Sequence, residues 1–204
     1  MYRTRKLTTL AATAVLTLAG AVAAPQASAA APARTAPAAG AVVPPDGYVQ
    51  LINRRSKKCV DVEGRSHANG ADVHQWACRL DGNDNQLWQF QDVGDGWWIV
   101  VNEGSRLCLD VAEFSTADGG NIWQWQCGPT SNQRWRFIDR GDGWFSLQNQ
   151  NSEKCVDVAE YSVDDGADVW QWRCHGLYNQ QFRFFSYTVP PLSGQAHPPR
   201  AETP

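Results

Sequence analysis

Three aspartates in this sequence share a local pattern that could bind a ligand. Each follows a cysteine and an aliphatic residue, precedes a valine, and has a histidine or tryptophan 13 residues later and a tryptophan 15 residues later. The three sets are Asp61, His74 and Trp76; Asp110, Trp123 and Trp125; and Asp157, Trp170 and Trp172. A carboxylate accepts hydrogen bonds from adjacent hydroxyl groups, and an indole offers a flat apolar face. Together they suit a ligand that has hydroxyls on one side and C–H groups on another.

Strand alternation predicts that each aspartate meets its aromatic residues. In residues 59–62 it places the cysteine and the aspartate on the face opposite two valines. In residues 73–78 it places the histidine, the tryptophan and the second cysteine on one face. A disulfide between the two strands would then gather Asp61, His74 and Trp76, and the other two sets follow the same spacing. The competing interpretations are an aspartate that closes a turn and tryptophans that fill the core.

The six cysteines form three pairs with one constant separation of 19 residues. Six cysteines allow 15 connectivities, but a repeated structure is expected to repeat one local disulfide. The predicted pairs are Cys59 with Cys78, Cys108 with Cys127 and Cys155 with Cys174. Zinc is the alternative, but the close Cys-x-x-Cys spacing and the histidine partners of a structural zinc site are missing.

The same pairs belong to a longer motif that occurs three times, at intervals of 49 and 47 residues. Each copy runs from Cys-Leu/Val-Asp-Val through a glycine and Gln-Trp-x-Cys to a final Asn-Gln-x-Trp/Phe. Such a period indicates one copied unit that buries its apolar face against its neighbours. Short runs of Val, Trp, Phe and Tyr, broken by Gly-Asp-Gly turns, predict several strands in each unit. Three units favour closure about a pseudo-threefold axis over a propeller or a solenoid.

This threefold motif resembles the ricin B-chain lectin family, whose repeats carry a Gln-x-Trp motif. The resemblance covers the whole repeated region and implies an all-β fold, the β-trefoil, with one disulfide in each repeat. It also implies that the aspartate, the second aromatic residue and the asparagine of each Asn-Gln pair contact sugar. The asparagines are Asn85, Asn132 and Asn179. Phe182 departs from the motif by replacing the third tryptophan, and we expect it to change core packing slightly.

The repeats occupy residues 46–187, which we divide at about 46–96, 97–143 and 144–187. Residues 1–29 carry three early cations, an apolar run and a small-residue cleavage site, which is typical of a secretion signal. Residues 30–45 are rich in Ala and Pro and predict a linker, and residues 188–204 predict a proline-rich disordered tail. We therefore expect a secreted, extracellular protein with a single domain.

Charge narrows the range of partners. Removing residues 1–29 takes away three of the 18 Lys and Arg and none of the 21 Asp and Glu, which leaves a net charge of about −6. This sign disfavours nucleic acid and anionic membranes as partners. We expect a monomer that binds glycans or polysaccharide and needs no cofactor and no metal.

Three functions were weighed against the sequence. The first is a lectin module for galactoside- or xylan-type glycans, with up to three shallow pockets and no catalytic residue. The second is a glycoside hydrolase, which needs two facing carboxylates where the motif supplies one aspartate in each repeat. The third is a protein-binding trefoil, such as a protease inhibitor or the receptor-binding subunit of a toxin, because a fold alone does not decide function. The pattern favours the first.

Overall fold

The computed structural model describes residues 42–79 and 84–186. Within them the chain forms twelve β-strands and six short 3-10 helices. The predicted signal, most of the predicted linker and the predicted tail lie outside the described residues. No helix in the described part of the chain is long and apolar enough to cross a membrane.

Each repeat contributes four strands, and a 3-10 helix follows its second strand and its third strand. Repeat 1 has β1 (Gln50–Asn53), β2 (Cys59–Val62), η1 (Glu63–Arg65), β3 (Val73–Trp76), η2 (Asp84–Gln86) and β4 (Trp88–Asp92). Repeat 2 has β5 (Trp98–Asn102), β6 (Cys108–Val111), η3 (Ala112–Phe114), β7 (Gly120–Trp125), η4 (Ser131–Gln133) and β8 (Arg134–Asp139). Repeat 3 has β9 (Phe145–Asn149), β10 (Cys155–Val158), η5 (Ala159–Tyr161), β11 (Val169–Trp172), η6 (Tyr178–Gln180) and β12 (Phe182–Phe185).

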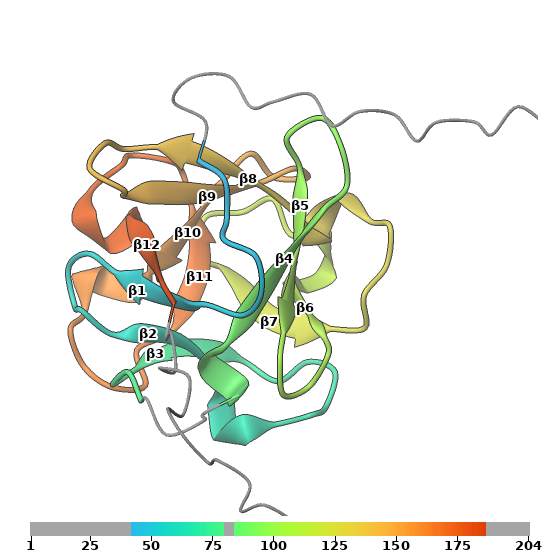
Figure 1. The fold of residues 1–204 in the computed structure, drawn as a ribbon, viewed down its shortest axis with the longest axis horizontal. Coiled ribbons are helices and arrows are strands. Elements are labelled where there is room, and N and C mark those ends of the chain that lie inside the picture. The colour runs from blue at the N-terminus through green and yellow to red at the C-terminus, as the bar shows by residue number, and fades with distance from the viewer. Residues whose placement is uncertain (1–41, 80–83, 187–204) are drawn as a thin grey trace, which may run out of the picture. The chain divides into compact units, whose positions relative to one another are not determined.

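The first and last strands of the repeats close into a six-stranded barrel (Figure 1). Antiparallel pairs join β4 to β5, β8 to β9 and β12 to β1. The barrel closes through β5 with β8, β9 with β12, and a bridge between Val49 and Trp88. That bridge has backbone N to O distances of 2.9 and 2.8 Å in its two directions.

The second and third strands form three hairpins beside the barrel, namely β2 with β3, β6 with β7 and β10 with β11. Each hairpin also pairs with the next through its outer strand, at Asp72 with Trp123, Trp170 with Asn121 and His74 with Asp168. A six-stranded barrel capped by three mutually paired hairpins is a β-trefoil. The predicted all-β fold with pseudo-threefold symmetry is therefore confirmed.

The core lies inside the barrel and under the hairpins. The aliphatic residues on either side of each aspartate face the core, as alternation predicts, and Val60 and Val62, for example, are both buried. Trp88 and Trp135 are fully buried, and their indole N–H groups donate to the Val60 and Leu109 carbonyls at 3.0 Å. Phe182 fills the equivalent place, also fully buried. Its ring has no N–H to donate, so the third repeat lacks this hydrogen bond and keeps the packing.

All three predicted disulfides are present, and each joins two Cα atoms 5.0 Å apart. Every bond ties the start of a hairpin's first strand to the residue two beyond its second strand. The site residues of one hairpin are thereby held in one place relative to each other.

A buried glutamine locks each hairpin to the one before it. The Gln124 side chain accepts a hydrogen bond from the Ser105 hydroxyl at 2.6 Å and donates to the Ser66 and Ala68 carbonyls at 2.8 and 3.0 Å. Gln75 and Gln171 make the same bonds in the other repeats. Each hairpin is therefore positioned by its neighbour as well as by its own strands.

Candidate functional site

The three aspartates lie on the hairpins, each directly opposite the residue 13 positions later. Asp61 pairs with His74, Asp110 with Trp123 and Asp157 with Trp170. The next pair on the same face joins the first cysteine to the second aromatic residue, as Cys108 is opposite Trp125. The structure therefore brings the residues of each predicted set together, and we call the three sets pocket 1, pocket 2 and pocket 3 after their repeats.

Pocket 2 shows the arrangement most fully. Asp110 Oδ1 accepts a hydrogen bond from Trp123 Nε1 at 2.7 Å, and its Oδ2 accepts from Asn132 Nδ2 at 2.9 Å and Gln133 Nε2 at 2.8 Å. Trp123 stacks on Trp125, with ring centroids 5.0 Å apart and an interplanar angle of 25°. Trp125 is 41% exposed. The first indole therefore orients the carboxylate, and the second presents an open apolar face beside it.

These residues line an open depression of about 470 Å³. Asp110, Trp125 and Asn132 form part of its lining, together with Phe114 and Thr130. Of a carboxylate's roughly four acceptor positions, three on Asp110 are taken by protein donors. From its residue type alone, each aspartate is expected to accept hydrogen bonds from adjacent hydroxyl groups of a ligand. The geometry leaves Asp110 room for one, because the aspartate is also a buried bracing group.

Pocket 1 replaces the first indole by an imidazole. Asp61 Oδ1 lies 3.0 Å from His74 Nε2 and accepts from Asn85 Nδ2 at 2.8 Å, while Oδ2 accepts from Gln86 Nε2 at 2.8 Å. His74 stacks on Trp76, with ring centroids 5.5 Å apart. The geometry of pocket 2 is kept with a smaller aromatic platform.

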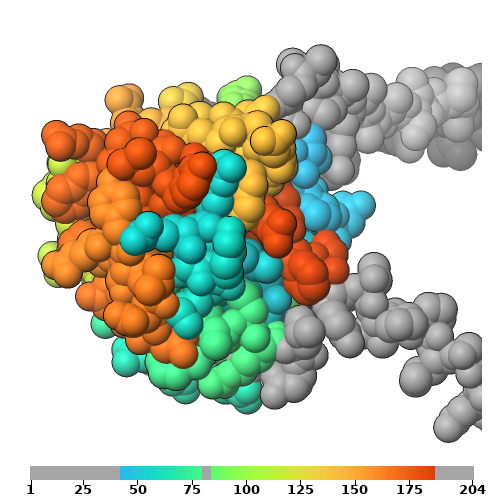
Figure 2. Space-filling view, turned by 90° about the vertical axis from the view of Figure 1, so that its left-hand side faces the viewer, coloured from blue at the N-terminus to red at the C-terminus, as the bar shows by residue number. Residues whose placement is uncertain are grey.

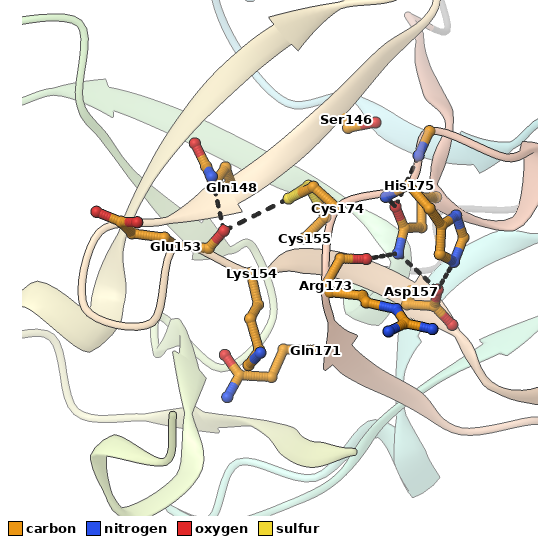
Figure 3. Close-up of a disulfide and its surroundings, with 12 residues drawn as sticks. Ser146, Gln148, Glu153, Lys154, Cys155, Asp157, Gln171, Arg173, Cys174 and His175 are labelled. Carbon is orange, nitrogen blue, oxygen red and sulfur yellow. Dashed lines mark hydrogen bonds and ion pairs between the residues drawn. A yellow bond between two sulfur atoms is a disulfide. The ribbon is translucent and has the colours of Figure 1, made fainter. Parts of the chain in front are cut away.

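Pocket 3 contains a histidine that the repeat pattern does not predict (Figure 3). Asp157 accepts from Trp170 Nε1 at 2.9 Å and from Gln180 Nε2 at 2.8 Å, and its Oδ2 lies 3.4 Å from His175 Nε2. The third predicted asparagine, Asn179, donates to the Val158 carbonyl at 3.1 Å. The aligned residues of the other repeats are Arg79 and Gly128, so the threefold motif does not point to His175.

Two further sets of residues complete the pockets. The buried glutamines Gln86, Gln133 and Gln180 each donate to a backbone carbonyl and to the aspartate of their pocket. Phe114 and Tyr161 stand four residues after their aspartates, and that shared offset was the signal for them. Both have positive φ, 55° and 58°, a costly conformation for aromatic residues that tends to cluster at binding sites.

Each second tryptophan also rests on a glycine of another repeat. A Cβ atom at Gly70 would lie 3.5 Å from Trp125, one at Gly119 3.6 Å from Trp172, and one at Gly166 3.6 Å from Trp76. The three glycines have φ between 77° and 79°, which strongly favours glycine. Each pocket is therefore built at a junction between two repeats.

Burial raises the pKa of the Asp110 and Asp157 carboxyl groups above their ordinary value of 3.8, and the hydrogen bonds they accept oppose part of the rise. A protonated carboxyl group loses acceptor capacity, so we expect ligand affinity at pockets 2 and 3 to fall on acidification before an ordinary aspartate would titrate. The effect on stability has the opposite sign. Because the folded pKa is raised, these groups contribute stability below 3.8 that is lost as pH rises through the folded pKa.

Calorimetric titration with ligand across this acidic range tests the effect on affinity, and urea unfolding over the same range tests the effect on stability. Both are measured on the wild type and on a variant with Asp110→Ala and Asp157→Ala. An affinity that stays constant down to pH 3.8 would contradict the expected acidification effect.

Comparison with known proteins agrees with this geometry. The profile of the ricin-type β-trefoil lectin domain matches residues 47–182. No curated protein matches the chain. Among solved structures, a designed threefold-symmetric protein, ThreeFoil, is 42% identical with a TM-score of 0.67, and the match covers 70% of this chain and 100% of that one.

Two natural proteins are similar over part of their length. An exo-β-1,3-galactanase from Clostridium thermocellum is 34% identical with a TM-score of 0.65, over 70% of this chain and 31% of the enzyme. The hemolytic lectin CEL-III is 31% identical with a TM-score of 0.56, over 67% of this chain and 29% of the lectin. This chain thus corresponds to about a third of either protein. From its profile match, its fold and its threefold motif, the chain belongs to the family of ricin-type β-trefoil lectin domains.

Proposed function

We propose that this protein is secreted and binds galactoside- or xylan-type glycans through its three pockets, without catalysing a reaction on them. The observation that carries the proposal is the threefold recurrence of one arrangement. In every repeat a buried carboxylate is fixed by side-chain donors beside a stacked aromatic pair. Core packing would not leave the outer ring of each pair partly exposed, as it is for Trp76, Trp125 and Trp172.

The chemistry of pocket 2 suits a pyranose. The C–H face of the ring packs on Trp125, while one hydroxyl donates to the remaining acceptor position on Asp110. Among the described residues, the side-chain oxygens of Asn85, Asn132 and Asn179 are buried and have no hydrogen-bond partner. The same atom is unpaired in every repeat, and Asn132 lines the depression.

Three such pockets make weak single sites useful. A shallow, open site with few polar contacts binds one sugar weakly, but a polymer that engages two or three pockets gains from their high effective concentration. We therefore expect polysaccharide to bind more tightly than any monosaccharide. A monomer with three pockets is sufficient for this gain.

The carboxylates favour binding over hydrolysis. Asp110 shares its depression with Glu113, but both Asp110 oxygens are occupied by neutral N–H donors. A retaining or inverting hydrolase needs one carboxylate free to attack or to activate water. The similarity to the galactanase covers 31% of that enzyme, and we extend none of its catalytic activity to this chain.

A glycan array combined with a reducing-sugar assay tests the proposal. The exported protein is expected to retain galactoside- or xylan-type glycans and to release no reducing sugar from them after prolonged incubation. If no glycan on the array is bound and the protein binds a protease or another protein instead, the protein-binding alternative is favoured. Release of reducing sugar would favour the hydrolase.

A further inference from the structure

The loop between β1 and β2 differs from its counterparts in charge. It carries four cations, of which Lys58 pairs with Asp165, as Lys154 of the β9–β10 loop pairs with Asp118. At the remaining positions the β1–β2 loop has three cations, the β5–β6 loop one cation and one anion, and the β9–β10 loop one anion. The aligned residues are Arg54, Arg55 and Lys57; Glu103, Gly104 and Arg106; and Gln150, Asn151 and Glu153. The positive charge therefore belongs to one loop and not to the trefoil scaffold.

This loop lies across the rim of pocket 3. Arg55 Nε donates to the Tyr161 carbonyl at 2.7 Å, and the Arg55 guanidinium lies 5.9 Å from the Tyr161 ring centroid. Tyr161 in turn stacks on His175, 6.0 Å away between centroids. Figure 2 shows the teal atoms of the start of repeat 1 directly against the orange atoms of repeat 3. At pocket 2 the residue equivalent to Arg55 is the neutral Asn151, whose Nδ2 donates to the Phe114 carbonyl at 3.0 Å.

The positive charge of this loop also reaches Tyr178 and Trp144. The Arg54 guanidinium lies 4.3 Å from the ring centroid of Tyr178, the residue before pocket residue Asn179. Three cations also surround Trp144. Arg54 and Arg183 lie 5.1 Å and Lys57 5.4 Å from its ring centroid. We call the four residues Arg54, Arg55, Lys57 and Arg183 the cationic rim.

Within the described residues no carboxylate forms an ion pair with the cationic rim, and the acidic side chains nearest pocket 3, Glu160, Asp164, Asp165 and Asp168, line a separate depression that includes Trp170. The ion pairs among the described residues involve Lys58, Lys154, His74 and His175. Arg55, Lys57 and Arg183 are exposed, and the one side-chain hydrogen bond of Arg55 uses its Nε. Arg54, Lys57 and Arg183 surround one ring and lack a carboxylate partner in the described part of the chain, so their charges repel each other. A bound anionic group would relieve that repulsion.

We propose that pocket 3 prefers a sugar that carries an anionic substituent, a carboxylate or a sulfate, which the cationic rim receives. The preference rests on the proposed glycan binding and gives it a substrate class. The floor of pocket 3, with Asp157 and Trp172, holds the hydroxyls and the C–H face. Arginine suits the rim because its planar N–H groups pair with the oxygens of carboxylate or sulfate. Pocket 2, with neutral Asn151 and Gly128 in equivalent places, prefers neutral sugars.

The test isolates pocket 3 in the full-length exported chain with Trp76→Ala and Trp125→Ala. Titration calorimetry at low salt compares a neutral xylo-oligosaccharide with its glucuronate-substituted form, and a neutral galactoside with its 6-sulfated form. The two pairs separate a carboxylate ligand from a sulfate ligand. In at least one of the two pairs we expect the anionic sugar to bind about tenfold more tightly than its neutral partner, and we expect this difference in affinity to shrink as the salt concentration rises.

Variants of the cationic rim complete the test. The triple change Arg55→Gln, Lys57→Gln and Arg183→Gln should remove the preference for anionic sugars and keep the affinity for neutral sugars. A variant with Arg55→Lys in place of Arg55→Gln, and the other two changes kept, should regain part of the preference. Arg106→Gln is the matched control, because Arg106 occupies the position of Lys57 and lies over Tyr48. Equal affinity for neutral and anionic sugars, or a preference that survives the triple change, would overturn this inference and leave glycan binding intact. Failure of the wild type to bind any of the four sugars would overturn both.

Discussion

Replacing Asp61, Asp110 and Asp157 by alanine should abolish retention of the protein on its polysaccharide. Each aspartate supplies a charged acceptor to a sugar hydroxyl, and the loss of a hydrogen bond to a charged group costs about 1.5 to 3 kcal/mol. That cost corresponds to roughly a 10- to 150-fold weaker single pocket. Loss at all three pockets also removes the gain from multivalent engagement. Affinity electrophoresis in a polysaccharide gel measures the effect directly.

The alanine variant needs a folding control, because each aspartate also braces its pocket. Removal of Asp110, for example, takes one of two acceptors from each of the Gln133 and Asn132 amide groups. A matched variant changes Asp92 and Asp139 to alanine, two aspartates that each accept a turn N–H at 2.8 Å away from the pockets. It should keep full retention. Full retention by the pocket variant, with an unchanged melting profile, would remove the proposed chemistry.

Loss of one disulfide should cost about 3 kcal/mol of unfolding free energy, because the bond closes a loop of this length in the unfolded chain. For a domain of this size that is roughly a 10 °C lower melting temperature. The variant is Cys108→Ala with Cys127→Ala, and scanning calorimetry is the measurement. Since Cys108 lies opposite Trp125, we also expect weaker binding at pocket 2.

The same pair of changes in another repeat is the internal control. Cys155→Ala with Cys174→Ala should lower the melting temperature by a similar amount and leave pocket 2 unaffected. A shift below about 2 °C in either variant would mean that the hairpins are held by other contacts, such as the hydrogen bonds of the buried side chains of Gln75, Gln124 and Gln171.

Most of the fold could be predicted from the sequence because the signal was repeated. One copy of Cys-Val-Asp-Val is compatible with many structures, but three copies with a constant cysteine separation fix both the disulfides and the threefold symmetry. The alternation argument placed Asp110 opposite Trp123 for a simple reason. A disulfide at the end of a hairpin leaves one register for the residues beside it.

The details of the site were less accessible, because they depend on contacts between repeats. Arg55 belongs to repeat 1 and reaches pocket 3 in the neighbouring repeat 3, and no spacing within the repeat motif relates Arg55 to Tyr161. The chain has positive φ at Phe114 and at Gly176, directly after His175, so strand alternation does not place these two side chains. The repeat pattern describes what the pockets share, so it is silent about what makes them differ.

A crystal structure with a bound neutral oligosaccharide tests the central claim most directly. We predict a sugar ring stacked on the exposed face of Trp125, with one hydroxyl within hydrogen-bond distance of Asp110 Oδ1 and another near Asn132. Sugar bound elsewhere on the trefoil, with these three side chains free of contact, would contradict the account.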